Sequence, residues 1–241
     1  GMLLRIIAIT TVFGIIIICC KDITFGILFA PNSSEFITYR IIEDVCKQMN
    51  MAVVFEPYSI QMINTELSSQ FMTHLSTSVY LALLLASPFI LIELFRFITP
   101  ALYDNERKYS ARITCTIFLL FITGVLMSYF VIFPFSIRFL GTYQVSEDVV
   151  NMINLSSYIS TFTALTFMMG IVFQIPVISF FLAKMGILEA EFMARYRRLA
   201  LIIIMILAAI ITPPDIFTLV LVTIPMYALY ELSILIVKRI N

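Results

Sequence analysis

Three polar side chains lie in or beside long apolar runs of this chain and are the first candidates for chemistry: Glu93, Gln174 and Glu231. A carboxylate or an amide inside a bilayer is costly, so each such residue needs a partner, a cavity or a function. Two of them have local explanations. Arg96 follows Glu93 at i,i+3, and Glu231 lies near the end of its run, where water can solvate it.

Gln174 has no such neighbour, but it lies two residues before Pro176. The proline ring removes a backbone donor and frees the carbonyl of Val172. The amide can satisfy backbone groups at this kink, or it can face a cavity or a partner helix. The sequence leaves both interpretations open.

Enzymatic chemistry has little support in this sequence. The chain has a single histidine, His74, for which a hydrogen-bonded structural role near a helix end is the commoner explanation. It has no HExxH motif, no GxSxG elbow and no glycine-rich phosphate loop. We therefore predict a protein that is not an enzyme, without catalytic residues, metal site or cofactor.

The composition places the chain among polytopic membrane proteins. Apolar residues make up 61% of it and charged residues 12%, and its mean hydropathy is +1.03. We predict an all-α integral membrane protein, a single domain over residues 1–241, whose helices form a curved, concave bundle. Its six transmembrane helices are predicted at residues 3–20, 71–98, 110–134, 158–185, 199–211 and 216–237.

The last two of these helices look short. An unbroken run of thirteen apolar residues extends from Leu199 to Ile211, and a second, mostly apolar run from Ile216 meets Glu231 after fifteen residues. Such runs rise only about 20 to 23 Å, whereas the hydrocarbon core of a bilayer is about 30 Å thick. We therefore expect local thinning of the bilayer, tilting, or shielding by neighbours at this hairpin.

The basic residues predict the orientation. Eleven of the fifteen lysine and arginine residues fall on the side of the termini, and most acidic residues fall on the other. This bias predicts that both termini are cytoplasmic. The net charge of the chain is zero, and its basic and acidic residues lie on opposite sides. This charge balance argues against nucleic-acid binding.

Residues 21–70 and 135–157 should form extracytoplasmic loops that cap the bundle. A helix is predicted in the first loop from apolar residues at near-helical spacing, namely Phe36, Ile37, Ile41, Val45 and Met49. A shorter helix is expected between Ser146 and Met152. The cap either covers the end of the bundle or binds a partner, and the first is favoured.

Several motifs follow one another in a specific order. Residues 97–107 read Phe-Ile-Thr-Pro-Ala-Leu-Tyr-Asp-Asn-Glu-Arg, a proline stop and an aromatic followed by a carboxylate and bases. Phe-Gln-Ile-Pro at 173–176, Thr-Pro-Pro-Asp at 212–215 and Pro-Met-Tyr-Ala-Leu-Tyr-Glu at 225–231 come later, while Pro31 and Phe71 precede them. In this order the motifs closely resemble those of TatC, the multispanning subunit of the twin-arginine protein translocase, over essentially the whole chain.

The resemblance implies a signal-peptide receptor and core scaffold that exports folded proteins by using the proton-motive force. It implies a signal-binding site at Glu106, Phe97, Pro100, Leu102, Tyr103 and Arg107. Glu106 would be the charge partner of the signal's arginines, since guanidinium and carboxylate groups pair bidentately. It also implies intramembrane partner contacts at Gln174, Pro176, Tyr227 and Glu231, and structural roles in the outer loops for Pro31, Phe71, Pro214 and Asp215.

The implied partners are twin-arginine signal peptides of folded cargo, single-span TatA- and TatB-type subunits, further copies of the chain and membrane lipids. The implied location is the cytoplasmic (inner) membrane. Two features depart from the family pattern. The usual acidic H-L-x-E-L-R segment before the first helix is absent, which we expect to be a truncation of this copy, and Glu93 and Phe95 stand where Gln and Trp are common.

An alternative function is an ion-coupled secondary transporter of a small solute. Glu93, Gln174 and the proline-broken helices suggest it, and it would require a midplane site built from discontinuous segments. The sequence shows no pair of matching halves, and the ordered motifs argue against this alternative.

Overall fold

A computed structural model of the chain describes residues 2–49, 60–65, 67–98, 107–144, 146 and 151–240, with the side chains of 2–3, 94–98 and 107–112 left aside. Within these ranges the chain is helical apart from two short strands. The elements are α1 (Met2–Cys19), α2 (Lys21–Phe29), η1 (Ala30–Asn32), α3 (Ile37–Gln48), β1 (Gln61–Ile63), α4 (Ser69–Ile98), α5 (Arg107–Met127), the π-helical η3 (Ser128–Ile132), α6 (Phe133–Thr142), β2 (Met152–Asn154), α7 (Leu155–Val172), α8 (Ile175–Lys184), α9 (Ala190–Arg195), α10 (Arg197–Ile211) and α11 (Ile216–Lys238).

The described helices include four that are long and apolar enough to cross a membrane: Ser69–Glu93, Ile113–Thr142, Leu155–Lys184 and Ile216–Lys238. A fifth is possible if Leu4–Cys19 and Lys21–Gln48, bent by 86°, form one broken span. α10 has only 15 residues. The six-span arrangement and the concave shape therefore stay predictions.

The last hairpin differs from its prediction in one helix. α10 is short, as expected, but α11 has 23 residues, which rise about 34 Å. The predicted bounds 216–237 match α11, but the expectation that this helix is short is wrong, because the helix continues past Glu231 to Lys238. The Glu231 carboxylate pairs with Arg197 of α10, and both side chains are partly exposed.

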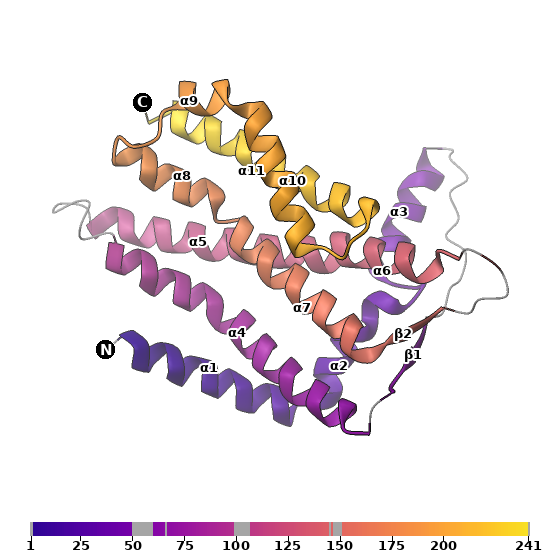
Figure 1. The fold of residues 1–241 in the computed structure, drawn as a ribbon. Coiled ribbons are helices and arrows are strands. Elements are labelled where there is room, and N and C mark those ends of the chain that lie inside the picture. The colour runs from indigo at the N-terminus through magenta and orange to yellow at the C-terminus, as the bar shows by residue number, and fades with distance from the viewer. Residues whose placement is uncertain are drawn as a thin grey trace.

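The long helices run between two ends of the molecule (Figure 1). One, here called the termini end, contains the start of α1, the end of α4, the start of α5 and the ends of α8 and α11. The opposite end, here called the strand end, contains β1, β2 and the end of α6. The start of α1 and the end of α11 lie at the same end of the molecule (Figure 1). An even number of membrane crossings predicts this placement.

The two predicted outer loops are joined by a parallel strand pair that the sequence analysis did not predict. Gln61 pairs with Met152, Met62 with Ile153 and Ile63 with Asn154. The expected helix between Ser146 and Met152 lies mostly outside the described residues. The helix predicted from Phe36 to Met49 is confirmed as α3.

α5 and α7 pack closely because glycines lie where they meet. A Cβ on Gly124 would lie 2.5 Å from the Met169 carbonyl oxygen, and one on Gly170 would lie 2.5 Å from the Phe121 ring. Small residues allow two helix backbones to approach in this way within a membrane. The contact fixes the position of Gln174, which lies two residues after the end of α7.

The third predicted helix does not end at Pro134, which is a correction to the sequence analysis. Pro134 cannot donate to the carbonyl of Phe130, four residues earlier, so that carbonyl needs another donor. The Thr38 hydroxyl of α3 donates to it at 2.5 Å. With the carbonyl satisfied from outside, the helix continues through η3 and α6 to Thr142.

The same arrangement recurs at Pro31. This proline leaves the Ile27 carbonyl of α2 without its helical donor, and the Tyr129 hydroxyl donates to that carbonyl at 2.8 Å. The neighbouring Leu28 carbonyl accepts from the Tyr158 hydroxyl, also at 2.8 Å. Hydrogen bonds between hydroxyls and carbonyls of distant helices thus hold α2 and α3 against the bundle, with α2 accepting and α3 donating.

Candidate functional site

Most of the predicted signal-binding residues fall outside the described part of the structure. Pro100, Leu102, Tyr103 and Glu106 belong to residues 99–106, between the end of α4 and the start of α5. Phe97 and Arg107 lie on the flanking helix ends, but their side chains are not described. The helix ends place both flanks of this loop at the termini end (Figure 1).

Glu93 is paired with a residue that the sequence analysis did not name. Its Oε1 atom lies 3.5 Å from Nη1 of Arg5 on α1. The side chain of Arg96, the predicted partner of Glu93, lies outside the described part of the structure. The Arg5 side chain is 70% exposed and that of Glu93 20%, so this acid–base pair remains open to solvent at the termini end.

Gln174 is buried in the protein at the break between α7 and α8. Only 1% of it is exposed, and its Nε2 atom donates to the Ile117 carbonyl of α5 at 3.2 Å. Its Oε1 atom has no partner among the described residues. The amide therefore bonds to the backbone of α5 within the chain, and its role as a partner contact stays a prediction. Pro176 lies in the first turn of α8 beside it.

Glu231 forms the best-defined charged group of the described structure. Arg197 of α10 approaches it with two nitrogens, Nε at 2.9 Å from Oε1 and Nη2 at 3.0 Å from Oε2. The Tyr227 hydroxyl, one turn earlier on α11, donates to Oε1 at 3.0 Å. Solvation alone does not explain Glu231, because this bidentate pair joins the two helices of the last hairpin.

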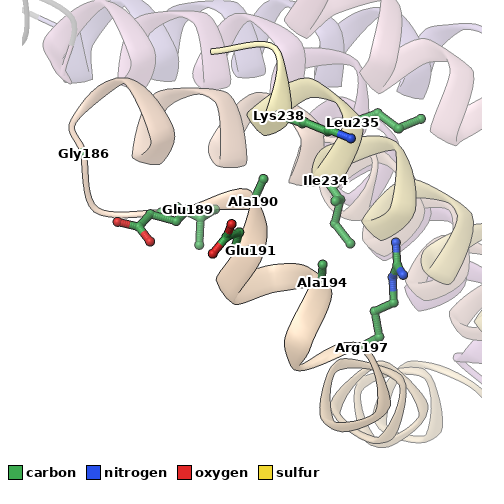
Figure 2. A pocket seen from close by; sticks show the side chains of 10 residues that line it. Gly186, Glu189, Ala190, Glu191, Ala194, Arg197, Ile234, Leu235 and Lys238 are labelled. Atoms are coloured by element: carbon green, nitrogen blue, oxygen red, sulfur yellow. The ribbon is translucent and has the colours of Figure 1, made fainter. Parts of the chain in front are cut away.

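A cavity of about 710 Å³ opens beside this pair (Figure 2). Glu189 and Glu191 stand on one wall, from the start of α9 and the residue before it, while Arg197 and Lys238 come from α10 and α11. Ile234 contributes apolar surface between them. Such a cavity can bind a ligand that carries both charge and apolar surface, and it contains no nucleophile paired with a base.

The residues predicted to shape the outer loops lie in turns and at helix ends. Asp215 begins α11: its Oδ1 atom accepts from the Thr218 amide at 2.6 Å, which is an N-cap interaction. Its own amide donates to the Pro213 carbonyl at 2.7 Å, so residues 212–215, Pro214 included, form the tight turn that was expected. Pro31 is buried in η1, whereas Phe71 at the start of α4 is 66% exposed.

Sequence reasoning missed the ion pairs between helices. Arg197 and Glu231 are 34 residues apart, and Arg5 and Glu93 belong to helices separated by the first loop. Charge counting located the bases on one side, but only the packing of the helices shows which acid each base contacts. The sequence signal that could have indicated these ion pairs was the presence of charged residues near the helix ends.

Together these features define a class: a helical membrane protein whose helices are joined by acid–base pairs at the termini end. Within the described residues, no group of three or more His, Cys, Asp or Glu side chains could hold a metal ion. Residues 2–225 match the family model described as Sec-independent protein translocase protein (TatC). The chain therefore belongs to the TatC family, and it is a membrane component of a protein translocase.

Similar proteins agree with this assignment. The TatC protein of Blattabacterium from Periplaneta americana is 37% identical over 224 residues, 91% of this chain and 84% of that protein. The TatC protein of Carboxydothermus hydrogenoformans is 35% identical over 231 residues, 94% of this chain and 89% of that protein. A crystal structure described as the twin-arginine translocase receptor TatC superposes with a TM-score of 0.78 at 27% identity, covering 99% of this chain and 96% of that one.

Proposed function

We propose that this chain is the signal-peptide receptor and core scaffold of a twin-arginine translocase that exports folded proteins. The observation that carries the proposal is the motif at residues 97–107, which connects two long helices at the termini end of a TatC-family chain. The solved relative described as a twin-arginine translocase receptor supports it.

In this proposal Glu106 pairs with the arginines of the signal. A guanidinium group presents its donors in a planar fork that matches a carboxylate, whereas lysine offers a single point charge. Phe97, Pro100, Leu102, Tyr103 and Arg107 shape the surrounding groove. Glu93, on the same helix as Phe97, would offer a second carboxylate to the signal if its pair with the exposed Arg5 opens.

The proposed orientation places the termini end in the cytoplasm, since eleven of fifteen basic residues lie on that side. Single-span TatA- and TatB-type subunits would pack along the bundle and on the last hairpin, near Tyr227 and Pro176, and copies of the chain would self-associate. The proton-motive force would act through these partners in the inner membrane. α10, at 15 residues, favours local thinning of the bilayer beside them.

The direct test is site-specific cross-linking of a twin-arginine signal peptide to the full-length chain carrying Glu106→Gln. We expect the signal cross-link to be lost, because the amide keeps the shape but not the charge that the guanidinium groups need. Glu189→Gln is the matched control, an exposed acid at the same end that should leave the cross-link unchanged. An undiminished cross-link in Glu106→Gln would contradict the role of this residue.

A second test addresses the whole function. Cells that lack the chromosomal gene and every paralogue should retain a folded reporter with a twin-arginine signal in the cytoplasm. The full-length gene should restore export. Continued export without the gene would contradict the proposed function, whichever residues bind the signal.

A further inference from the structure

α3 carries an apolar stripe that no described part of the chain covers. Ile37, Ile41 and Val45 are 52%, 55% and 48% exposed, and Met49, which directly follows the last turn, is 64% exposed. Residues four apart lie on one face of a helix, so these side chains form a continuous apolar strip along α3.

The first turn of α3 is held firmly against the bundle. Tyr39 is fully buried, and its hydroxyl donates to the Pro134 carbonyl at 2.6 Å. Thr38 donates to the Phe130 carbonyl, and the Phe36 ring stacks on that of Phe130 with centroids 5.8 Å apart. α3 therefore has a fixed start, while the strip extends away from the contact.

α3 is attached toward the strand end of an apolar span. The described part of that span, Ile113–Thr142, has 30 residues, which rise about 45 Å and exceed the roughly 30 Å hydrocarbon core. Pro134 lies in the last third of this range, so α3 is attached toward the end of the span, where a bilayer boundary is expected.

The direction and the charges of α3 fit the same boundary. Figure 1 shows α3 running across the direction of α5 and α6 rather than along it. Charged residues border the strip: Arg40 pairs with Glu35 at 2.6 Å, and Lys47 lies 4.0 Å from Asp44. A helix that lies across the spans and carries an apolar strip bordered by charged residues is typical of a membrane interface.

We propose that α3 lies in the lipid interface at the strand end, with Ile37, Ile41 and Val45 inserted among the acyl chains of the phospholipid. The partner is the bilayer surface rather than a second copy of the chain, because the strip lies at the depth and in the direction of that surface. The inserted helix fixes the depth of the bundle through Thr38 and Tyr39. This inference does not rest on the proposed function.

The chain contains no tryptophan, so a single introduced tryptophan reports on its own surroundings. Val45→Trp and Lys47→Trp form a matched pair, since positions two residues apart point about 200° apart on a helix. Each variant of the full chain is reconstituted into phosphatidylcholine vesicles, with and without brominated acyl chains. Fluorescence is then quenched with the brominated lipid or with aqueous acrylamide.

We expect brominated lipid to quench Val45→Trp several-fold more than Lys47→Trp, and acrylamide to show the reverse order. Equal quenching of both by acrylamide would show a solvated helix and overturn the proposal. Protection of Val45→Trp from both quenchers would show a protein contact, such as a second copy, and would also overturn it. Ile41→Trp repeats the measurement on the same strip if Val45→Trp does not fold.

Discussion

The two ends of the molecule are held together by different interactions. At the strand end, buried or partly buried hydroxyls donate to carbonyls from helices far away in sequence, as Tyr39 does to Pro134 and Tyr158 to Leu28. At the termini end, the described contacts between helices include partly exposed ion pairs, Arg5 with Glu93 and Arg197 with Glu231. Buried hydrogen bonds resist salt and solvent, whereas exposed ion pairs exchange partners at little cost.

In the proposed function, the signal peptide binds at the termini end. Its arginines would compete there for partly exposed carboxylates, while the hydrogen bonds of the strand end keep the helices in register. The comparison predicts that stability depends mainly on the strand end. The following substitutions test it, from the largest expected effect on stability to the smallest.

Tyr39→Ala should destabilise the protein most, by about 3 to 5 kcal/mol. The substitution removes a fully buried ring and the hydroxyl that holds the Pro134 carbonyl. Thermal unfolding in a fixed detergent should show a markedly lower midpoint. A midpoint equal to that of the unmodified chain would mean that α3 does not anchor the strand end.

Thr38→Val should cost about 1 to 2 kcal/mol, because the Phe130 carbonyl loses the donor that replaces the missing amide of Pro134. Thr123→Val is the control: that hydroxyl bonds to the Leu119 carbonyl within its own helix and is exposed. The same unfolding measurement should show little change for the control. Similar losses in both variants would argue against a special role of the proline-freed carbonyl.

Arg197→Lys should reduce stability by about 0.5 to 1 kcal/mol, since the ammonium keeps the charge but not the two-pronged contact with Glu231. The loss should shrink at high salt, because the arginine and glutamate side chains are 48% and 34% exposed. Unfolding midpoints at low and high ionic strength test both points. A loss of stability as large as that expected for Tyr39→Ala would show that the termini end contributes as much to stability as the strand end.

Arg5→Ala should change stability by less than about 0.5 kcal/mol. The pair with Glu93 is long, at 3.5 Å, and the arginine is 70% exposed. The unfolding midpoint should therefore stay within error of the unmodified chain. A clear drop would show that this pair holds α1 against α4.

Much of the helical architecture could be predicted from the sequence, because apolar runs of membrane length have few alternatives to helix in lipid. The turn at residues 212–215, the break before Pro176 and the helix at α3 all followed from proline, aspartate and helical spacing. The continuation past Pro134 could not be predicted, because it depends on a distant donor, Thr38.

The candidate site was predictable only where it depends on local sequence. Sequence motifs locate Glu106 and its neighbours in one loop, and that assignment stays a prediction because residues 99–106 lie outside the described structure. Gln174 was left between two interpretations, and the packing of α5 against α7 shows it buried on the Ile117 carbonyl. The strand pair was missed because three-residue strands carry no measurable alternation.

The sequence by itself determined the class, the family motifs and the division of basic and acidic residues between the predicted loops, since these depend on composition, order and local spacing. Only the tertiary structure decided which groups satisfy the carbonyls freed by Pro31 and Pro134 and which acids meet Arg5 and Arg197. Thr38 and Phe130 are 92 residues apart, and Tyr129 and Ile27 are 102 apart. Lipid supplies no donors, so these groups must find one another within the folded protein, and helix packing selects the partners.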